Sequence, residues 1–131
     1  MREAAMLKAH NPPAMFAPVG PYCHGLEVVQ PTRFLFSSGT MGLDREGHAP
    51  DGIEAQLETA WDNLKAILAE AGMTVGNIVK VTTFLADRSL RGPATAYRQA
   101  VLGDHKPAVT TMVAGLLQDD WLVEIEIVAA A

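Results

Sequence analysis

The stretch Val123-Glu124-Ile125-Glu126-Ile127 decides the fold of this chain, because its side chains alternate strictly between apolar and acidic. A period of two is typical of a β-strand with one buried and one open face. The run from Lys106 to Val113 is a second, β-branched stretch. Together they predict a strand pair in which the valine and isoleucines of the first stretch line a core, while Glu124 and Glu126 point away from it.

A change of period marks a long helix in the middle of the chain. From Ile53 on, apolar residues recur at intervals of three and four, which predicts one core-facing stripe: Leu57, Ala60, Trp61, Leu64, Ile67, Leu68 and Ala71. Asp51, with Glu54 three residues later, predicts the N-terminal cap, and Gly72 suits the left-handed residue after the last turn. A second helix is expected over Pro93–Leu102, since proline fits the first turn.

The remaining β-rich runs complete the predicted sheet. Leu26–Val29 and Arg33–Ser38 are separated by Gln30-Pro31-Thr32, which predicts a hairpin. Ile78–Leu85 predicts a strand with apolar atoms on both faces. The order β, β, α, β, α, β, β predicts a compact α+β subunit with a mostly antiparallel or mixed sheet and both helices on one face. The other, half-apolar face is then an assembly surface, so an oligomer is expected.

Length and composition narrow the class of protein. A chain of 131 residues fits one domain, residues 1–131, with a core that needs no disulfides. No window is apolar enough for a membrane span, and the first eight residues lack the pattern of a secretory signal. With a single cysteine, Cys23, a cytoplasmic location is expected. The net charge of -5 argues against nucleic acid and favours a small, neutral or masked ligand.

The histidines give no sign of a metal site. His10, His24, His48 and His105 lack the short intervals of a local metal motif. One cysteine cannot build a zinc cluster. We therefore expect neither a metal nor another cofactor.

Five pieces of sequence occur in an order that resembles the Rid family. They are Ala17-Pro18-Val19-Gly20-Pro21-Tyr22, Phe36-Ser37-Ser38-Gly39, Gln56 with Asn63, Pro107-Ala108 and Val123-Glu124-Ile125-Glu126. This reactive intermediate deaminase family is also called YjgF or liver perchloric-acid-soluble protein, and the resemblance runs from about Ala17 to Ala130. It implies a chorismate-mutase-like subunit in a homotrimer, with helices outside, a central β-barrel and three clefts at the subunit interfaces.

The resemblance also implies chemistry on imines and enamines. Members of the best-known branch hydrolyse compounds such as 2-aminoacrylate, which tautomerises to 2-iminopropanoate before water attacks the C=N carbon and ammonia leaves. In that branch an arginine directly after the Pro-Ala pair binds the substrate carboxylate, and here that position is Val109. Since each charged hydrogen bond contributes roughly 1.5–3 kcal/mol, a substrate other than 2-iminopropanoate is expected. His105 and Lys106 replace the arginine only if the turn before Pro107 directs them to the same place.

Glu124 is the first candidate for a catalytic group. The resemblance implies that a carboxylate at this position orients the attacking water or shuttles its proton. Without the resemblance, an alternating glutamate on a strand is a solvated residue, and that interpretation stands for Glu126. Tyr22 is the second candidate, either closing a cleft and donating its hydroxyl or serving as an interface aromatic.

Substrate-binding candidates flank these two residues: Cys23, His24, Ser38, Gly39, Thr40, Val109 and Thr111. Neighbours in an extended segment point to opposite sides, so a Cys23–His24 pair is not expected, and a lone cysteine is usually a small buried hydrophobe. His24 either donates to a ligand oxygen in place of the missing arginine or is structural. The turn at Ser38–Thr40 resembles the family's cleft wall, where Gly39 lets a ligand approach the backbone; the alternative is an ordinary turn.

Three functions stay open on the sequence alone. The first is an enzyme acting on an imine, an enamine or a similarly reactive small molecule, by hydrolysis, dehydration or tautomerisation. The second is a non-catalytic trimeric protein that binds or senses a small ligand. The third is the ribonuclease activity ascribed to some relatives of the Rid family, which the net charge of -5 opposes.

Overall fold

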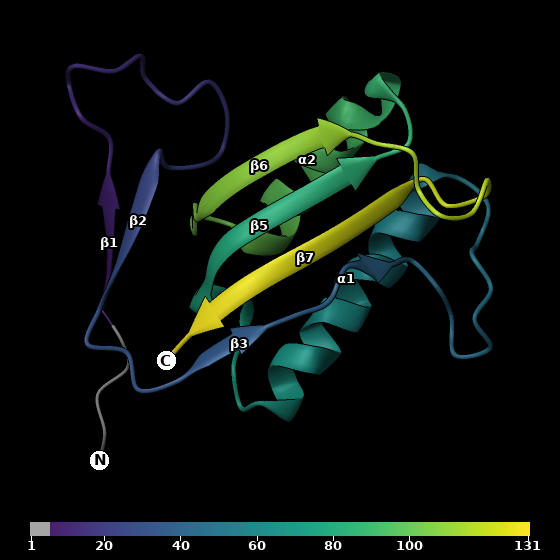
Figure 1. The fold of residues 1–131 in the computed structure, drawn as a ribbon, viewed down its shortest axis with the longest axis horizontal. Helices are drawn as coiled ribbons and strands as arrows, with labels where there is room; N and C mark the ends of the chain where they lie inside the picture. Colours follow the sequence, from purple (N-terminus) through teal and green to yellow (C-terminus); the bar gives the residue numbers. More distant parts are fainter. Residues whose placement is uncertain (1–5) are drawn as a thin grey trace.

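A computed structural model describes residues 6–131, which form a mixed sheet backed by helices (Figure 1). The strands in chain order are β1 (Met6–His10), β2 (Gly25–Val29), β3 (Phe34–Phe36), β4 (Thr40–Met41), β5 (Ile78–Leu85), β6 (Ala108–Val113) and β7 (Val123–Ala130). The α-helices are α1 (Ile53–Glu70) and α2 (Arg91–Leu102), and two short 3₁₀ helices are η1 (Val75–Asn77) and η2 (Arg88–Leu90). The predicted α+β class is confirmed.

The main sheet is built around β7. Its order is β3-β7-β5-β6, and β4 also pairs with β7. β5 and β6 run parallel while the other pairs are antiparallel, so the sheet is mixed. The expected strand pair is therefore not a direct one, because β5 lies between β6 and β7. Both helices cover the same face of this sheet (Figure 1), which leaves an open face on the other side.

The core lies between α1 and the sheet. The predicted stripe of α1 is confirmed: its buried residues include Leu57, Ala60, Trp61, Leu64 and Leu68. They pack against the apolar side chains of β5 and β7, of which Val81, Leu85, Ile125 and Ile127 are almost fully buried. Each such aliphatic side chain stabilises the fold by roughly 1.5–3 kcal/mol relative to exposure. Within residues 6–131, neither helix is long and apolar enough to cross a bilayer.

The hairpin expected from Leu26–Val29 and Arg33–Ser38 is wrong. β2 pairs with β1, which the sequence did not predict, and β3 pairs with the C-terminal strand β7. Gln30 adopts a φ of 52°, and Pro31 cannot donate a ladder hydrogen bond. The connection therefore leads the chain away from β2, and the β1–β2 hairpin stands beside the main sheet (Figure 1).

The helix ends agree with the sequence in part. Gly72 adopts the expected left-handed conformation after α1, with a φ of 69°. Asp51 does not cap the helix: the N-cap is Gly52, with a φ of 90°, and no side chain bonds to the free amides there. The cap prediction fails because the chain turns one residue later, at the glycine. α2 begins at Arg91, so Pro93 still lies in its first turn.

Candidate functional site

Glu124 lies on the open face of the sheet, directly over the glycine that precedes β4. Its neighbours Val123 and Ile125 are buried while Glu124 is partly exposed, which confirms the predicted alternation. A Cβ atom built at Gly39 would lie 2.9 Å from the Glu124 Cδ and 3.1 Å from its Cγ. Any side chain at residue 39 would therefore require the Glu124 carboxylate to move. The absence of a side chain at Gly39 thus allows Glu124 its observed position.

The turn around Gly39 is stabilised by the hydroxyl groups of Ser37 and Thr40. Ser37 Oγ donates to the Ser38 carbonyl at 2.9 Å, and Thr40 Oγ1 donates to the same oxygen at 3.1 Å. The hydroxyl of Thr40 is thus engaged in the turn. Because β4 pairs with β7 beside Glu124, the candidates Ser38, Gly39, Thr40 and Glu124 come together, and we call them the Glu124 cluster.

Two amides of α1 fasten the backbone around the Glu124 cluster. Gln56 is buried, and its Nε2 donates to the carbonyls of Pro50 and Asp120 at 3.0 and 2.9 Å. Its Oε1 accepts from the Leu122 amide at 2.8 Å, directly before β7 begins. Asn63 Nδ2 donates at 3.0 Å to the main-chain carbonyl two residues after β4. The motif residues Gln56 and Asn63 therefore hold the main chain next to β4 and β7.

A cavity of about 930 Å³ lies between α2, the edge strand β6 and the loop before β2. We call it the α2–β6 cavity. Its wall includes three of the predicted site residues and three arginines, which are Tyr22, Val109, Thr111, Arg88, Arg91 and Arg98. Within residues 6–131, no aspartate or glutamate lines it. The cavity is therefore cationic, although the chain carries a net charge of -5.

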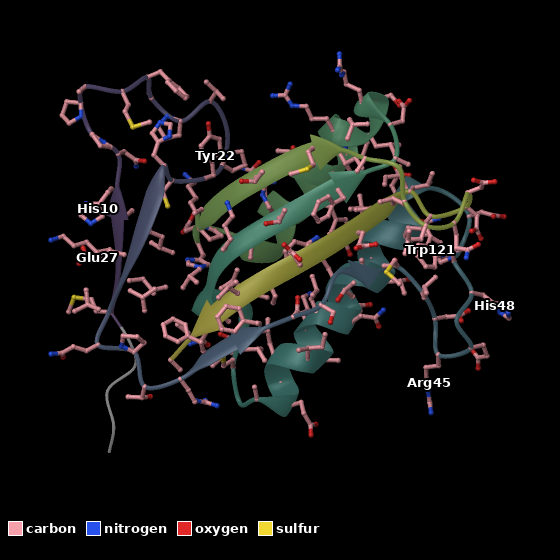
Figure 2. The ribbon with its side chains drawn as sticks, in the orientation of Figure 1. His10, Tyr22, Glu27, Arg45, His48 and Trp121 are labelled. Carbon is pink, nitrogen blue, oxygen red and sulfur yellow. The ribbon has the colours of Figure 1, made fainter. Side chains whose placement is uncertain are left out.

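Tyr22 contributes to this cavity from the long loop between β1 and β2. Figure 2 shows its side chain between that loop and the edge of the main sheet. The Tyr22 hydroxyl accepts from the Val19 amide at 3.2 Å, and the Tyr22 ring lies edge-on to that of His24, 5.9 Å away. The loop thus folds over its own tyrosine, and the phenol faces the same space as β6.

Val109 and Glu124 lie on opposite sides of the sheet. Val109 pairs with the buried Val81 of β5, and neighbours across a parallel pair share a face. Val109 and Thr111 thus face the helix side, whereas Thr110 accepts a hydrogen bond from Lys80 Nζ at 2.7 Å on the open face. The sequence-predicted site therefore falls into two groups within one chain: the Glu124 cluster and the α2–β6 cavity.

Arg98 is a cavity residue that the sequence analysis missed. It is only 5 % exposed, and its Nε has no hydrogen-bond partner among residues 6–131. Burial lowers the pKa of its guanidinium, because the charged form loses water. The other buried residues of α2 are Ala94 and Leu102, four positions on either side. The sequence signal for Arg98 is its spacing: it lies at the centre of the i, i+4, i+8 stripe formed with Ala94 and Leu102.

Cys23 and His24 are held in structural contacts. Cys23 is 3 % exposed, its amide donates to the Pro107 carbonyl at 3.3 Å, and burial raises the pKa of its thiol. The His24 Nε2 bonds to the Phe16 carbonyl at 2.6 Å, and the ring packs edge-on against that of Phe16 at 4.8 Å. Within the described part of the chain, neither residue lines the α2–β6 cavity.

The two residues before Pro107 are directed away from Val109. The His105 Nε2 bonds to the Ile78 carbonyl at 2.7 Å. Lys106 lines a second, smaller cavity of about 290 Å³ beside β1 and β2. Among residues 6–131, there is no group of three His, Cys, Asp or Glu side chains that is arranged to hold a metal ion.

Comparisons with known proteins agree on one family. The model of the family described as endoribonuclease L-PSP matches residues 13–131. A 2-iminobutanoate/2-iminopropanoate deaminase from Escherichia coli is 32 % identical over 117 residues, covering 86 % of this chain and 89 % of that protein. A RutC family protein from Aquifex aeolicus is 39 % identical, covering 86 % and 90 %. The fold is shared with a Rid family protein from Yersinia pestis, with a TM-score of 0.84 at 23 % identity, covering 95 % and 98 %.

Proposed function

The chain belongs to the Rid family, also described as endoribonuclease L-PSP, and from this premise we propose that it is an enzyme that hydrolyses a reactive imine or enamine. The name of the Escherichia coli relative, a deaminase of 2-imino acids, supports this reaction type. RNA cleavage is not proposed, because a net charge of -5 repels a phosphate backbone.

The active site of the proposed enzyme lies between two copies of the chain in a homotrimer. The observation that carries this proposal is the separation of the Glu124 cluster from the α2–β6 cavity, since Glu124 and Val109 lie on opposite sides of the sheet. The open face also exposes two aromatic side chains, Phe34 at 51 % and Phe36 at 72 %. Assembly through that face buries these rings. It also lets the Glu124 cluster of one copy meet the cavity of the next.

The proposed reaction uses few protein groups. Glu124 accepts a proton from water as its oxygen attacks the C=N carbon, and the imine nitrogen gains a proton. The proton on the imine nitrogen comes from solvent. The resulting carbinolamine then collapses: the C–N bond breaks, the carbonyl forms as the hydroxyl proton returns to solvent, and ammonia leaves with the proton that Glu124 took from water. Tyr22 supplies a hydroxyl near the reacting atoms. No metal or cofactor takes part in these steps.

The proposed substrate is larger than 2-iminopropanoate. Val109 presents an aliphatic surface in the position of the family's arginine, so the apolar part of the substrate packs against it. A cavity of about 930 Å³ falls in the range of sites that enclose drug-sized molecules. An imine with a longer or cyclic apolar portion therefore fits this site better than a three-carbon compound.

An assay of ammonia release tests the proposed function. Enamines are generated in situ, and the purified chain is expected to accelerate ammonia release over buffer. Glu124→Gln is expected to lower kcat/KM by about 10²-fold or more, because an acid–base group is lost. Glu126→Gln is the matched control, since Glu126 lies on the same strand and the same face. No acceleration with any of several candidates contradicts the proposal and favours a non-catalytic ligand binder.

A further inference from the structure

Arg98 is a buried cation without a counter-charge in the part of the chain that the structure describes. Its side chain is 5 % exposed and its Nε has no partner there. The one side-chain contact with the geometry of a salt bridge within residues 6–131 joins His10 Nε2 to Glu27 Oε1, at 2.8 Å, in the β1–β2 hairpin. Burying the guanidinium Nε without a hydrogen-bond partner opposes folding, because the lost hydration of that N–H group is not replaced. A group of this kind calls for a partner from outside the chain.

The surroundings of Arg98 make that partner an anion. Arg91, Thr95 and Arg98 are spaced by four and three residues, so they share one face of α2. Arg91 and Arg88 are exposed while Arg98 is buried, which places positive charge from the mouth of the cavity to its interior. With no acidic side chain among the described lining residues, these charges add and attract an anion.

We propose that Arg98 is the anion-binding residue of the α2–β6 cavity and that it takes a carboxylate. This inference does not depend on the proposed hydrolysis. Arg98 reaches the cavity from α2, opposite the wall that Val109 forms on β6. The carboxylate then lies toward the helix and the apolar portion against Val109. In this arrangement the cation that binds the carboxylate is Arg98 on helix α2, whereas the best-known branch of the family has its arginine at the strand position that Val109 occupies here.

Calorimetry with stable analogues tests the inference. The probes are pyruvate and 2-oxohexanoate, carbonyl counterparts of 2-imino acids, together with their neutral methyl esters. The unaltered chain is expected to bind at least one acid about tenfold or more tightly than its ester, and Arg98→Gln should weaken acid binding about tenfold to a hundredfold. Arg45→Gln is the charge-matched control, since Arg45 lies in an exposed loop at the opposite end of the molecule from Tyr22 (Figure 2). Equal affinity for acid and ester, or unchanged binding by Arg98→Gln, overturns the inference.

Thermal unfolding separates a binding role from a structural one. Without ligand, Arg98→Gln should keep or raise Tm, because an unpaired buried charge is removed. Arg98→Lys should retain part of the acid binding. A lower Tm together with unchanged acid binding shows a structural arginine and contradicts the inference.

The two proposals fail in different ways. Acid binding that depends on Arg98, without ammonia release from any imine, removes the proposed function and leaves the anion site standing. Ammonia release that is insensitive to Arg98→Gln and equal for neutral substrates removes the anion site and leaves the hydrolase.

Discussion

The carboxylate of Glu124 occupies the space that a side chain on residue 39 would need, so Gly39 and Glu124 are fitted to each other across β4 and β7. The sequence suggested that this glycine admits a ligand to the backbone. The structure shows that it first admits a protein carboxylate. Glu124, the proposed proton-transfer group, thus has its observed orientation because Gly39 carries no side chain.

Gly39→Ala is expected to reduce activity without unfolding the protein. The added methyl would displace the partly exposed Glu124 side chain, and a displacement of about 1 Å can lower catalysis about 10²-fold. Gly115→Ala is the control, because a Cβ there meets nothing within 4 Å. Ammonia release and thermal unfolding are measured together. An unchanged kcat/KM in Gly39→Ala would show that the position of Glu124 is irrelevant.

Gln56→Leu is expected to lower the free energy of unfolding by about 2–4 kcal/mol, because three main-chain groups lose their partners. Those groups hold the segment before β7 to α1. Gln118→Leu, at an exposed position, should change stability little. Urea denaturation compares the variants. Equal midpoints for the two would refute the anchoring role of Gln56.

The buried thiol of Cys23 is expected to make the protein less stable in alkaline solution. Its thiol has an ordinary pKa of 9.0 and a raised pKa in the fold, so the unfolded chain ionises first. This contribution to stability is complete below pH 9.0 and declines as pH rises toward the folded pKa, by at most about 1.4 kcal/mol per pH unit. Cys23→Ala should show a shallower decline in the free energy of unfolding. Parallel pH profiles for both proteins would contradict this assignment.

Val109→Arg is expected to tighten pyruvate binding by about tenfold, through new charged hydrogen bonds. It should also lower Tm, because a second guanidinium enters the cavity that contains Arg98. Val109→Leu serves as the uncharged control. Calorimetry that shows no gain would mean that residue 109 does not occupy the place of the family's arginine.

The sequence predicted those elements whose signal is local. The bounds of β5 and the stripe of α1 agree with the structure, because burial acts on each residue at a period of two or 3.6. The predicted pairing of β2 with β3 was wrong, because strand pairing is not a local property of the sequence. Their partners, β1 and the C-terminal β7, are set by contacts outside the short turn at Gln30-Pro31-Thr32.

The site could be predicted only in pieces. Glu124 and Val109 are recognisable from motifs, but their placement on opposite sides of the sheet depends on β5 lying between their strands. Arg98 was overlooked because a helical arginine is ordinarily exposed. Only its spacing from Ala94 and Leu102 shows that it falls within the buried stripe of α2.

Subunit mixing tests the central claim that each site joins two copies of the chain. Glu124→Gln removes the carboxylate, and Thr111→Trp fills the cavity from an exposed position on β6. Each variant alone should have about 1 % of the activity or less. If the chains are unfolded together in equal amounts and refolded, about one quarter of the sites combine an intact cavity with an intact Glu124 from a neighbour. Recovery of about one quarter of the ammonia-releasing activity is the predicted result. No recovery, with mixed oligomers demonstrated by mass spectrometry, would contradict the shared site.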